Sequence, residues 1–328
     1  MSKTLRNALI MLLVAIVIGV GGWYFLGGTT SRMAEQEVEQ FLVKNNLQDK
    51  LSYTKIEATP TGKAKVKEVK LLDDEGDLVF TADEFNLTNY KETEDVLEIS
   101  FDFVNLVDVK GDKFQNELNE VFEDMDVVTP KAIDLAWAMS LDNNKQTSNF
   151  KPTVVIPNLL KIEAELNADS PSAFMQAFAL LNDATKGDDT EIDTLKILDL
   201  ASVVKLHDFS LVVEDRGMMK PAIEAHKKKQ LPGDSTPELK KERDEQWANH
   251  VKESRDECLS NESFALVTNN ATKACNTMIE FMEAKTDKMR LKVAMGTPIT
   301  IEELMMLALM GFSDENFLLE SKPTIEID

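Results

Sequence analysis

The sequence predicts an α+β protein in which an N-terminal transmembrane helix is followed by an antiparallel sheet with interspersed helices. Three observations predict this class. An uncharged apolar run lies near the N-terminus, several later segments alternate polar and apolar residues, and other segments between them have helical periodicity.

The first predicted element is a membrane-spanning helix from Ala8 to Leu26, a stretch without a single charge. A helix of this length rises roughly 28 Å, about the thickness of a bilayer's hydrocarbon core. It ends near Trp23 and Tyr24, residue types that are enriched at membrane interfaces. Because no clear small-x-small cleavage site follows, we expect a permanent anchor rather than a cleaved signal peptide or a buried soluble helix.

The charges that flank this span predict its orientation. Lys3 and Arg6 precede it, whereas acidic residues dominate the stretch that follows. The positive-inside rule therefore keeps the N-terminus in the cytoplasm and exports the rest of the chain. Small residues, including Ala8 and Gly19, fall on one face of the span, and such a face permits weak homodimerisation through the membrane.

The exported part is strongly acidic. Because the first 30 residues carry two positive charges and no negative one, residues 31–328 carry a net charge of −24, against −22 for the whole chain. This charge argues against nucleic acid as a partner, since a sequence-independent grip on nucleic acid needs a basic surface. It also argues against a domain that lies flat on anionic lipid.

Alternation predicts the strands of the exported part. In "DVLEISFDF" the polar-side residues Val96, Glu98 and Ser100 alternate with an apolar set, which predicts one wet and one dry face. Similar patterns predict a first group of strands at 51–58, 62–73, 76–90 and 95–109, and a second group at 132–142, 148–157 and 159–168. Further strands are predicted at 203–215, 288–296 and 316–328.

Helical periodicity and end signals predict the helices. They are expected at 31–47, 113–125, 172–183, 217–229, 237–259, 272–285 and 300–311. Thr300 and Glu303 form a capping-box pattern at the start of the last of these, and Gly311 ends it. Helices between groups of strands favour the α+β class.

Cys258 and Cys275 are the two cysteines of the chain. Both fall in the exported part, where an even pair favours a disulfide that closes a loop of about 17 residues. The alternative is two buried free thiols. No histidine accompanies them at ligand spacing, so a zinc site is not expected.

Motifs for catalysis or for cofactor binding are not found in the sequence. His207, His226 and His250 lie in no metal-binding pattern, and the chain has no G-x-S-x-G, G-x-G-x-x-G or P-loop motif. The acidic stretch "LLDDEGDLV" lacks the ligand order of a calcium loop and reads as a hairpin turn. We therefore expect no metal, no cofactor and no enzymatic activity, although a hydrolase with a dispersed site stays an alternative.

The C-terminal third is rich in methionine, with nine of the fifteen methionines after residue 217. Methionine packs irregular gaps and adapts to varied apolar ligands. The segment 304–310, "LMMLALM", is apolar all round, which indicates burial or an interface. Core packing is one reading of these residues. A pliable apolar groove or interface is the other, and its candidate residues are Met218, Met219, Leu304, Met305, Met306, Leu307 and Met310.

The segment "TPTGKAKVKEVKLLDDEGDLVFTADEFNL" at 59–87 resembles the sheets of AsmA-like single-span bacterial envelope proteins, whose function is uncharacterised. The segment "VVKLHDFSLVVEDRGMM" at 203–219 resembles strand-into-helix units of uncharacterised envelope proteins. The resemblance implies a bacterial inner-membrane protein with a periplasmic domain, and it carries over no functional residue. This chain is shorter and richer in predicted helices than the larger members of that class.

Together these features suggest a domain plan and a function. Residues 1–28 are expected to form a cytoplasmic stub and anchor, and 29–230 a periplasmic sheet with helices. Residues 231–328 are expected to complete the same domain or form a second subdomain. The expected function is non-catalytic handling of an apolar, lipid-like ligand near the inner membrane. The alternative is a scaffold that binds a partner envelope protein.

Overall fold

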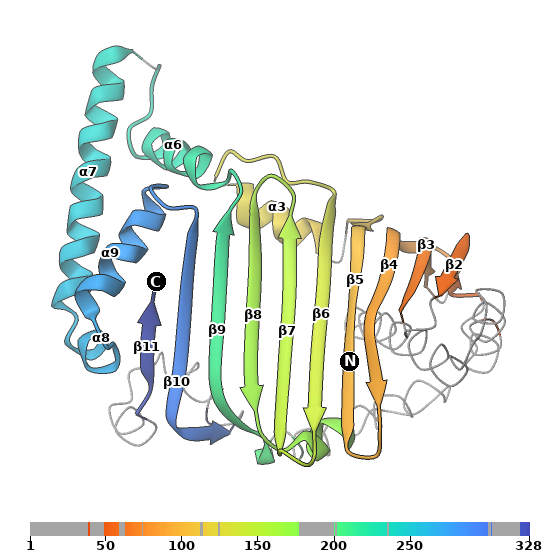
Figure 1. The fold of residues 1–328 in the computed structure, drawn as a ribbon. Coiled ribbons are helices and arrows are strands. Elements are labelled where there is room, and N and C mark those ends of the chain that lie inside the picture. The colour runs from red at the N-terminus through yellow and green to blue at the C-terminus, as the bar shows by residue number, and fades with distance from the viewer. Residues whose placement is uncertain are drawn as a thin grey trace.

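A single antiparallel sheet of eleven strands dominates the fold (Figure 1). The computed structural model describes residues 39, 49–58, 63–73, 75–111, 114–123, 125–176, 200, 202–234, 236–300, 303 and 322–328. The strand order is β1-β3-β4-β5-β6-β7-β8-β9-β10-β11, and β2 also pairs with β3. From β3 to β11, neighbours in the sheet are therefore consecutive strands in sequence.

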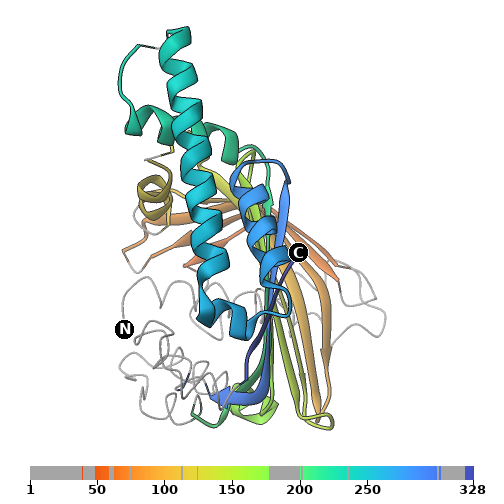
Figure 2. The same cartoon turned by 90° about the vertical axis from the view of Figure 1, so that its left-hand side faces the viewer.

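Most of the strands are long, and register shifts interrupt five of the pairings. Their bounds are β1 Leu51–Ser52, β2 Lys55–Ala58, β3 Ala64–Leu72, β4 Leu78–Glu92, β5 Val96–Asp108, β6 Ala132–Asp142, β7 Thr147–Ile156, β8 Leu160–Ala168, β9 Lys205–Asp215, β10 Lys288–Thr300 and β11 Thr324–Ile327. Figure 2 shows that the sheet they form is twisted, as expected for strands of L-residues.

The α+β class predicted from the sequence is wrong, because the described part of the chain is mostly one large antiparallel sheet with few helices. Helix α3, Gln115–Glu123, separates β5 from β6 in sequence, yet β5 and β6 pair directly. Likewise β9 pairs with β10 although four helices lie between them. The helices interrupt the sequence without dividing the sheet.

The predicted dry face of β5 is confirmed. Ile99, Phe101 and Phe103 are each at most 5% exposed, and they lie in one hydrophobic core with residues from β3 to β8. Phe85 on β4 is in contact with Phe103, with ring centroids 5.0 Å apart. Because the side chains of a strand alternate between faces, this core is formed by side chains from one face of the sheet.

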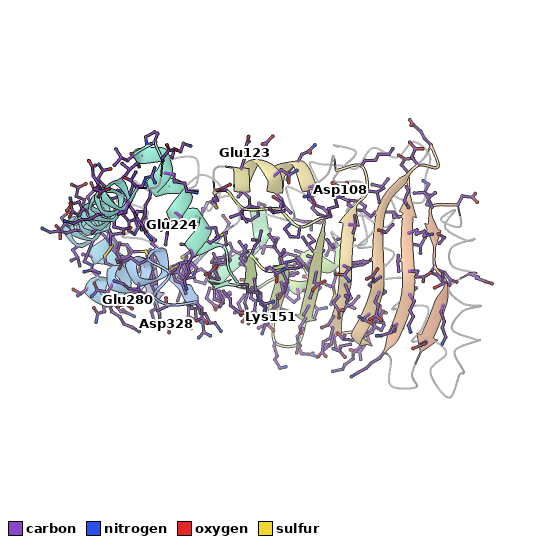
Figure 3. The ribbon with its side chains drawn as sticks, turned by 90° about the horizontal axis from the view of Figure 1, so that it is seen from above. Asp108, Glu123, Lys151, Glu224, Glu280 and Asp328 are labelled. Carbon is purple, nitrogen blue, oxygen red and sulfur yellow. A yellow bond between two sulfur atoms is a disulfide. The ribbon has the colours of Figure 1, made fainter. Side chains whose placement is uncertain are left out.

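Two described helical segments pack on this core. Phe114, just before α3, stacks on Phe80 with ring centroids 6.1 Å apart, and Phe122 of α3 is buried. Phe174, in the helical residues 171–176, contacts Phe150 of β7, with ring centroids 4.7 Å apart. In Figure 3, α3 with Glu123 lies on one side of the sheet and Lys151 lies on the other.

Aspartates at strand ends fix the turns and the helix starts. Asp108 accepts hydrogen bonds from the backbone amides of Gly111 and Phe114, which precede α3, and of Gln115, its first residue. Asp73 accepts from the amides of Glu75 and Asp77 and thereby closes the β3–β4 hairpin that the sequence predicts. These side chains satisfy backbone donors that would otherwise lack partners.

The remaining helices form an arm beside the β10–β11 edge of the sheet. They are α6 Met219–Gln230, α7 Pro237–Ser260, α8 Glu262–Val267 and α9 Ala271–Met282. α9 packs against β10 and β11, whereas α7 packs against α6, α8 and α9. Figures 1 and 2 show the α6–α7 end of this arm extending beyond the end of the sheet.

None of the described helices is long and apolar enough to cross a bilayer. The span expected from Ala8 to Leu26, with Gly19, Trp23 and Tyr24, lies outside the described residues.

Candidate functional site

Two rows of apolar side chains cross almost the whole sheet on one face. Directly opposed residues in an antiparallel ladder share a face, so the strand registers define the rows. One row is Val66, Phe85, Phe103, Leu135, Val154, Ile162, Val213 and Met289. A second row is Tyr90, Ile99, Met139, Phe150, Leu166, Phe209, Val293 and Ile325.

The burial of these rows falls from one end of the sheet to the other. Phe85 on β4 is 1% exposed and Ile99 on β5 is 2% exposed, whereas Phe209 and Val213 on β9 are only half-buried. We call the half-buried part on β8–β10 the open apolar face. Its residues are Ile162, Leu166, Phe209, Leu211, Val213, Met289, Leu291 and Val293.

The opposite face of the same strands is a polar ladder. The Asn149 amide on β7 donates to the carboxylate of Glu165 at 2.9 Å and to Asn167 on β8 at 2.5 Å. Asn167 in turn donates to Asp208 on β9 at 2.7 Å. Cross-strand amide and carboxylate pairs fix the register of these strands, and they make this face the polar one.

Ion pairs add to the polar face. Lys151 lies 2.9 Å from Glu165, and its hydrogen bond holds the pKa of that carboxyl below its ordinary value, with help from the Asn149 amide. Lys65 on β3 lies 2.7 Å from Glu84 on β4, and this contact lowers the pKa of Glu84 in the same way. Each carboxylate is stabilised in its charged form by a hydrogen bond from a cation.

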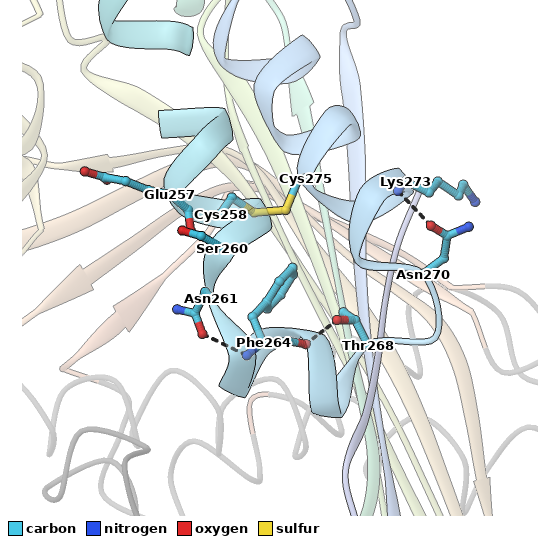
Figure 4. Close-up of a disulfide and its surroundings, with 9 residues drawn as sticks. All are labelled: Glu257, Cys258, Ser260, Asn261, Phe264, Thr268, Asn270, Lys273 and Cys275. Atoms are coloured by element: carbon cyan, nitrogen blue, oxygen red, sulfur yellow. Dashed lines mark hydrogen bonds between the residues drawn. A yellow bond between two sulfur atoms is a disulfide. The ribbon is translucent and has the colours of Figure 1, made fainter. Parts of the chain in front are cut away.

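The arm is fastened by a disulfide. Cys258, near the end of α7, is bonded to Cys275 in α9, with Cα atoms 5.9 Å apart (Figure 4). Cys275 is fully buried. Between them the chain turns twice, and Asn261 and Asn270 cap α8 and α9 by accepting from the amides of Phe264 and Lys273. The structure thus contains the cysteine pairing that the sequence favours.

A pocket of about 140 Å³ lies between α6 and α7. His226 of α6 and His250 of α7 have ring centroids 5.6 Å apart. The ring centroid of Trp247 lies 5.5 Å from that of His226 and 5.7 Å from that of His250. Lys227, Gln230, Arg243 and Gln246 also line the pocket, which therefore combines aromatic rings with neutral polar groups and two cations.

The candidate residues drawn from the methionine-rich third are only partly described. Met218 packs against the sheet core at the start of α6, and Met219 is the first residue of that helix. The amides of both donate to Asp215, at 2.8 and 3.0 Å. Leu304, Met305, Met306, Leu307 and Met310 lie outside the described residues. The capping box before them is present, since Thr300 and Glu303 bond to each other reciprocally.

Two features of the structure, the open apolar face and the ring cluster of His226, Trp247 and His250, are not predicted from the sequence. The open apolar face is missed because the alternation of β9 does not say how much of its dry side is covered. The ring cluster is missed because each histidine is judged alone. A signal for it exists, since Trp247 and His250 are three residues apart and so share a face of a predicted helix.

Among the described residues, no group of three or more His, Cys, Asp or Glu is arranged to hold a metal ion. No family model matches the chain, and no curated protein matches it.

Proposed function

We propose that this protein is a non-catalytic, membrane-anchored envelope protein that holds an apolar, lipid-like ligand on the open apolar face. The observation that carries the proposal is the fall in burial along apolar rows that are otherwise continuous. Phe85 and Val213 belong to one row, yet the first is buried and the second is half-buried.

An incompletely covered apolar surface of this kind favours a ligand. Leaving apolar side chains in water costs roughly 25 cal/mol per Å² of exposed area, so a hydrophobic occupant stabilises such a surface. Exposed apolar patches rimmed by polar residues commonly mark binding sites for lipid or protein. Here the polar ladder lies on the opposite face of the same strands, so only one face of these strands suits an apolar ligand.

The proposed location is the periplasmic side of the bacterial inner membrane, with the N-terminal run as a single-pass anchor. An anchor keeps the domain at a high effective concentration beside lipid, which raises occupancy without any additional contact. The acidity of the exported part is consistent with a domain that stands off an anionic membrane rather than lying flat on it.

Site-specific photocrosslinking tests the proposal. A benzophenone amino acid at Phe209, on the open apolar face, is expected to crosslink radiolabelled lipid in intact cells. The same group at Ser210, the next residue and on the polar face, is the matched control. Equal lipid crosslinking from both positions, or none from Phe209, would contradict the proposal.

A scaffold function is the second candidate, and α7 favours it. Of its 24 residues only Arg243 and Val251 are buried, so a long polar helix is presented to solvent. A benzophenone at exposed Glu245 that gives a discrete protein crosslink, while Phe209 gives no lipid, would favour the scaffold over the lipid proposal.

A further inference from the structure

Every described side chain that lines the pocket between α6 and α7 carries an N–H donor, and none of them carries a carboxylate. Lys227 and Arg243 are cations, and His226 and His250 become cations when they are protonated. The pocket therefore has a basic lining in a chain whose net charge is −22. We infer that it binds a phosphate group, either as inorganic phosphate or as the end of a small phosphate monoester.

Arg243 provides a fixed positive charge in the lining. This residue is only 5% exposed, and its guanidinium donates from Nε and Nη2 to the carbonyl oxygens of Leu231 and Gly233, both at 2.9 Å. These bonds hold the side chain in place, and they satisfy carbonyl acceptors just beyond the end of α6 that would otherwise repel an anion. Because a guanidinium stays protonated in proteins, its charge acts on an anion at any physiological pH.

Lys227 provides the second cation. Its side chain is 12% exposed, and its Nζ donates to Asp244 at 2.6 Å and to Glu224 at 3.1 Å. Burial disfavours the charged ammonium, but the hydrogen bonds to these carboxylates raise the pKa of Lys227 above its ordinary value. An ammonium has three N–H donors, so its partners among the described residues leave one for a ligand.

The carboxylates that hold Lys227 do not make the pocket acidic. Asp244 and Glu224 are 51% and 56% exposed, and neither of them lines the pocket. Solvent therefore screens their repulsion of a bound anion more strongly than it screens the attraction of the buried cations.

The two imidazoles couple anion binding to protons. The ring centroids of His226 and His250 lie 5.6 Å apart, and the pocket they line also contains Lys227 and Arg243. Like charges at such distances disfavour protonation of both rings together. A phosphate dianion offsets this repulsion, and a protonated imidazole donates a strong hydrogen bond to a phosphate oxygen. Binding should therefore strengthen as the histidines become protonated.

The size of the pocket favours a small ligand. Its volume of about 140 Å³ is well below the roughly 300–1,000 Å³ of sites for drug-sized molecules. A phosphate offers more acceptor oxygens than a carboxylate does, which suits donors that come from two facing helices. The site lies in the α6–α7 arm rather than on the open apolar face, so it is independent of lipid handling (Figure 1).

Titration of the full-length protein in detergent with inorganic phosphate tests this site. By calorimetry we expect one phosphate per chain. Gln246→Glu should weaken binding at least about tenfold, because it places a negative charge in the lining. Asn249→Asp is the matched control, because it makes the same chemical change on α7 at a residue that does not line the pocket. Gln246 and Asn249 are both exposed, so both variants should fold.

A second pair of variants removes a cation. Lys227→Met should weaken phosphate binding at least about tenfold, because it removes a charged hydrogen-bond donor. Lys228→Met, at the next residue and outside the pocket, should bind phosphate as the wild type does. Competition by glycerol phosphate, and by phosphatidic acid in the micelle, then distinguishes a soluble monoester from a lipid headgroup, and both outcomes support a phosphate site.

The role of the histidines has its own readout. Sulfate is the probe, because it keeps two negative charges throughout the range in which imidazole titrates. The wild type should bind sulfate more tightly at about pH 6 than at about pH 7.5, and His250→Gln should reduce this difference. No phosphate binding by the wild type, or equal binding by Gln246→Glu and Asn249→Asp, would overturn the inference.

Discussion

Gly217 lies so close to Asn158 that a Cβ atom added to Gly217 would stand 2.8 Å from the Asn158 carbonyl oxygen. Gly217 also has a φ of +132°, a conformation that residues with side chains rarely adopt. It links β9 to α6, so the position of the arm depends on this close approach.

Gly217→Ala should therefore destabilise the protein more than Gly76→Ala. Both glycines have positive φ, but a Cβ at Gly76 meets nothing within 4 Å. Gly76→Ala is expected to lower the free energy of unfolding by about 1 kcal/mol through backbone strain alone. Gly217→Ala adds a backbone collision to that strain. Equal losses in urea unfolding would show that the contact with Asn158 is dispensable.

The Cys258–Cys275 disulfide should stabilise the arm. Its 17-residue separation predicts a contribution of at most about 3 kcal/mol to the free energy of unfolding. The double variant Cys258→Ala, Cys275→Ala should unfold at a lower temperature than the wild type, and reductant should have no further effect on it. Alkylation of the native wild-type protein followed by mass spectrometry is the control. Two alkylated thiols there would mean that the bond does not form in cells.

The polar face should contribute to stability above acidic pH. Lys151 lowers the pKa of Glu165 below its ordinary value of 4.5, so the ionised carboxylate stabilises the folded state. This contribution is fully present above pH 4.5 and is lost as the pH falls through the lowered pKa of the folded state. Glu165→Gln and Lys151→Met should each flatten the pH dependence of stability below pH 4.5. A wild-type slope in both variants would contradict this assignment.

The sequence anticipates local structure better than assembly. The alternation of "DVLEISFDF" fixes which side of β5 is apolar, because side chains of a strand alternate whatever it pairs with. Pairing depends on contacts that the local pattern does not contain. The helical periodicity around Leu118 correctly predicts α3. It does not reveal that β5 and β6, which flank α3 in the sequence, pair directly with each other.

The candidate site was harder to predict for the same reason. His226 and His250 are 24 residues apart, and only the reversal of the chain between α6 and α7 brings their rings together. The half-burial of Val213 depends on what packs over it, which the sequence of β9 does not reveal. The polar residues that build the opposite face, by contrast, already stand at alternating positions, for example Asn149 and Lys151 on β7.

The proposed topology predicts one-sided labelling. Glu245→Cys on the exposed part of α7 should react with a membrane-impermeant maleimide in spheroplasts, whereas Ser2→Cys should react only after lysis. The native cysteines do not compete while they are joined in the disulfide. Reaction of Ser2→Cys alone in intact spheroplasts would place the domain in the cytoplasm.

The most direct test of lipid handling uses two neighbouring valines of β9. Val213 opposes Ile162 and Met289 on the open apolar face, whereas Val212 opposes Glu163 and Arg290 on the polar face. The full-length protein is purified from membranes, and bound lipid is measured by native mass spectrometry. Lipid binding on the open apolar face predicts near-stoichiometric lipid on the wild type and on Val212→Glu, and at least about tenfold less on Val213→Glu, because a buried charge disfavours an apolar ligand. Lipid retained equally by both variants, or absent from the wild type, would contradict it.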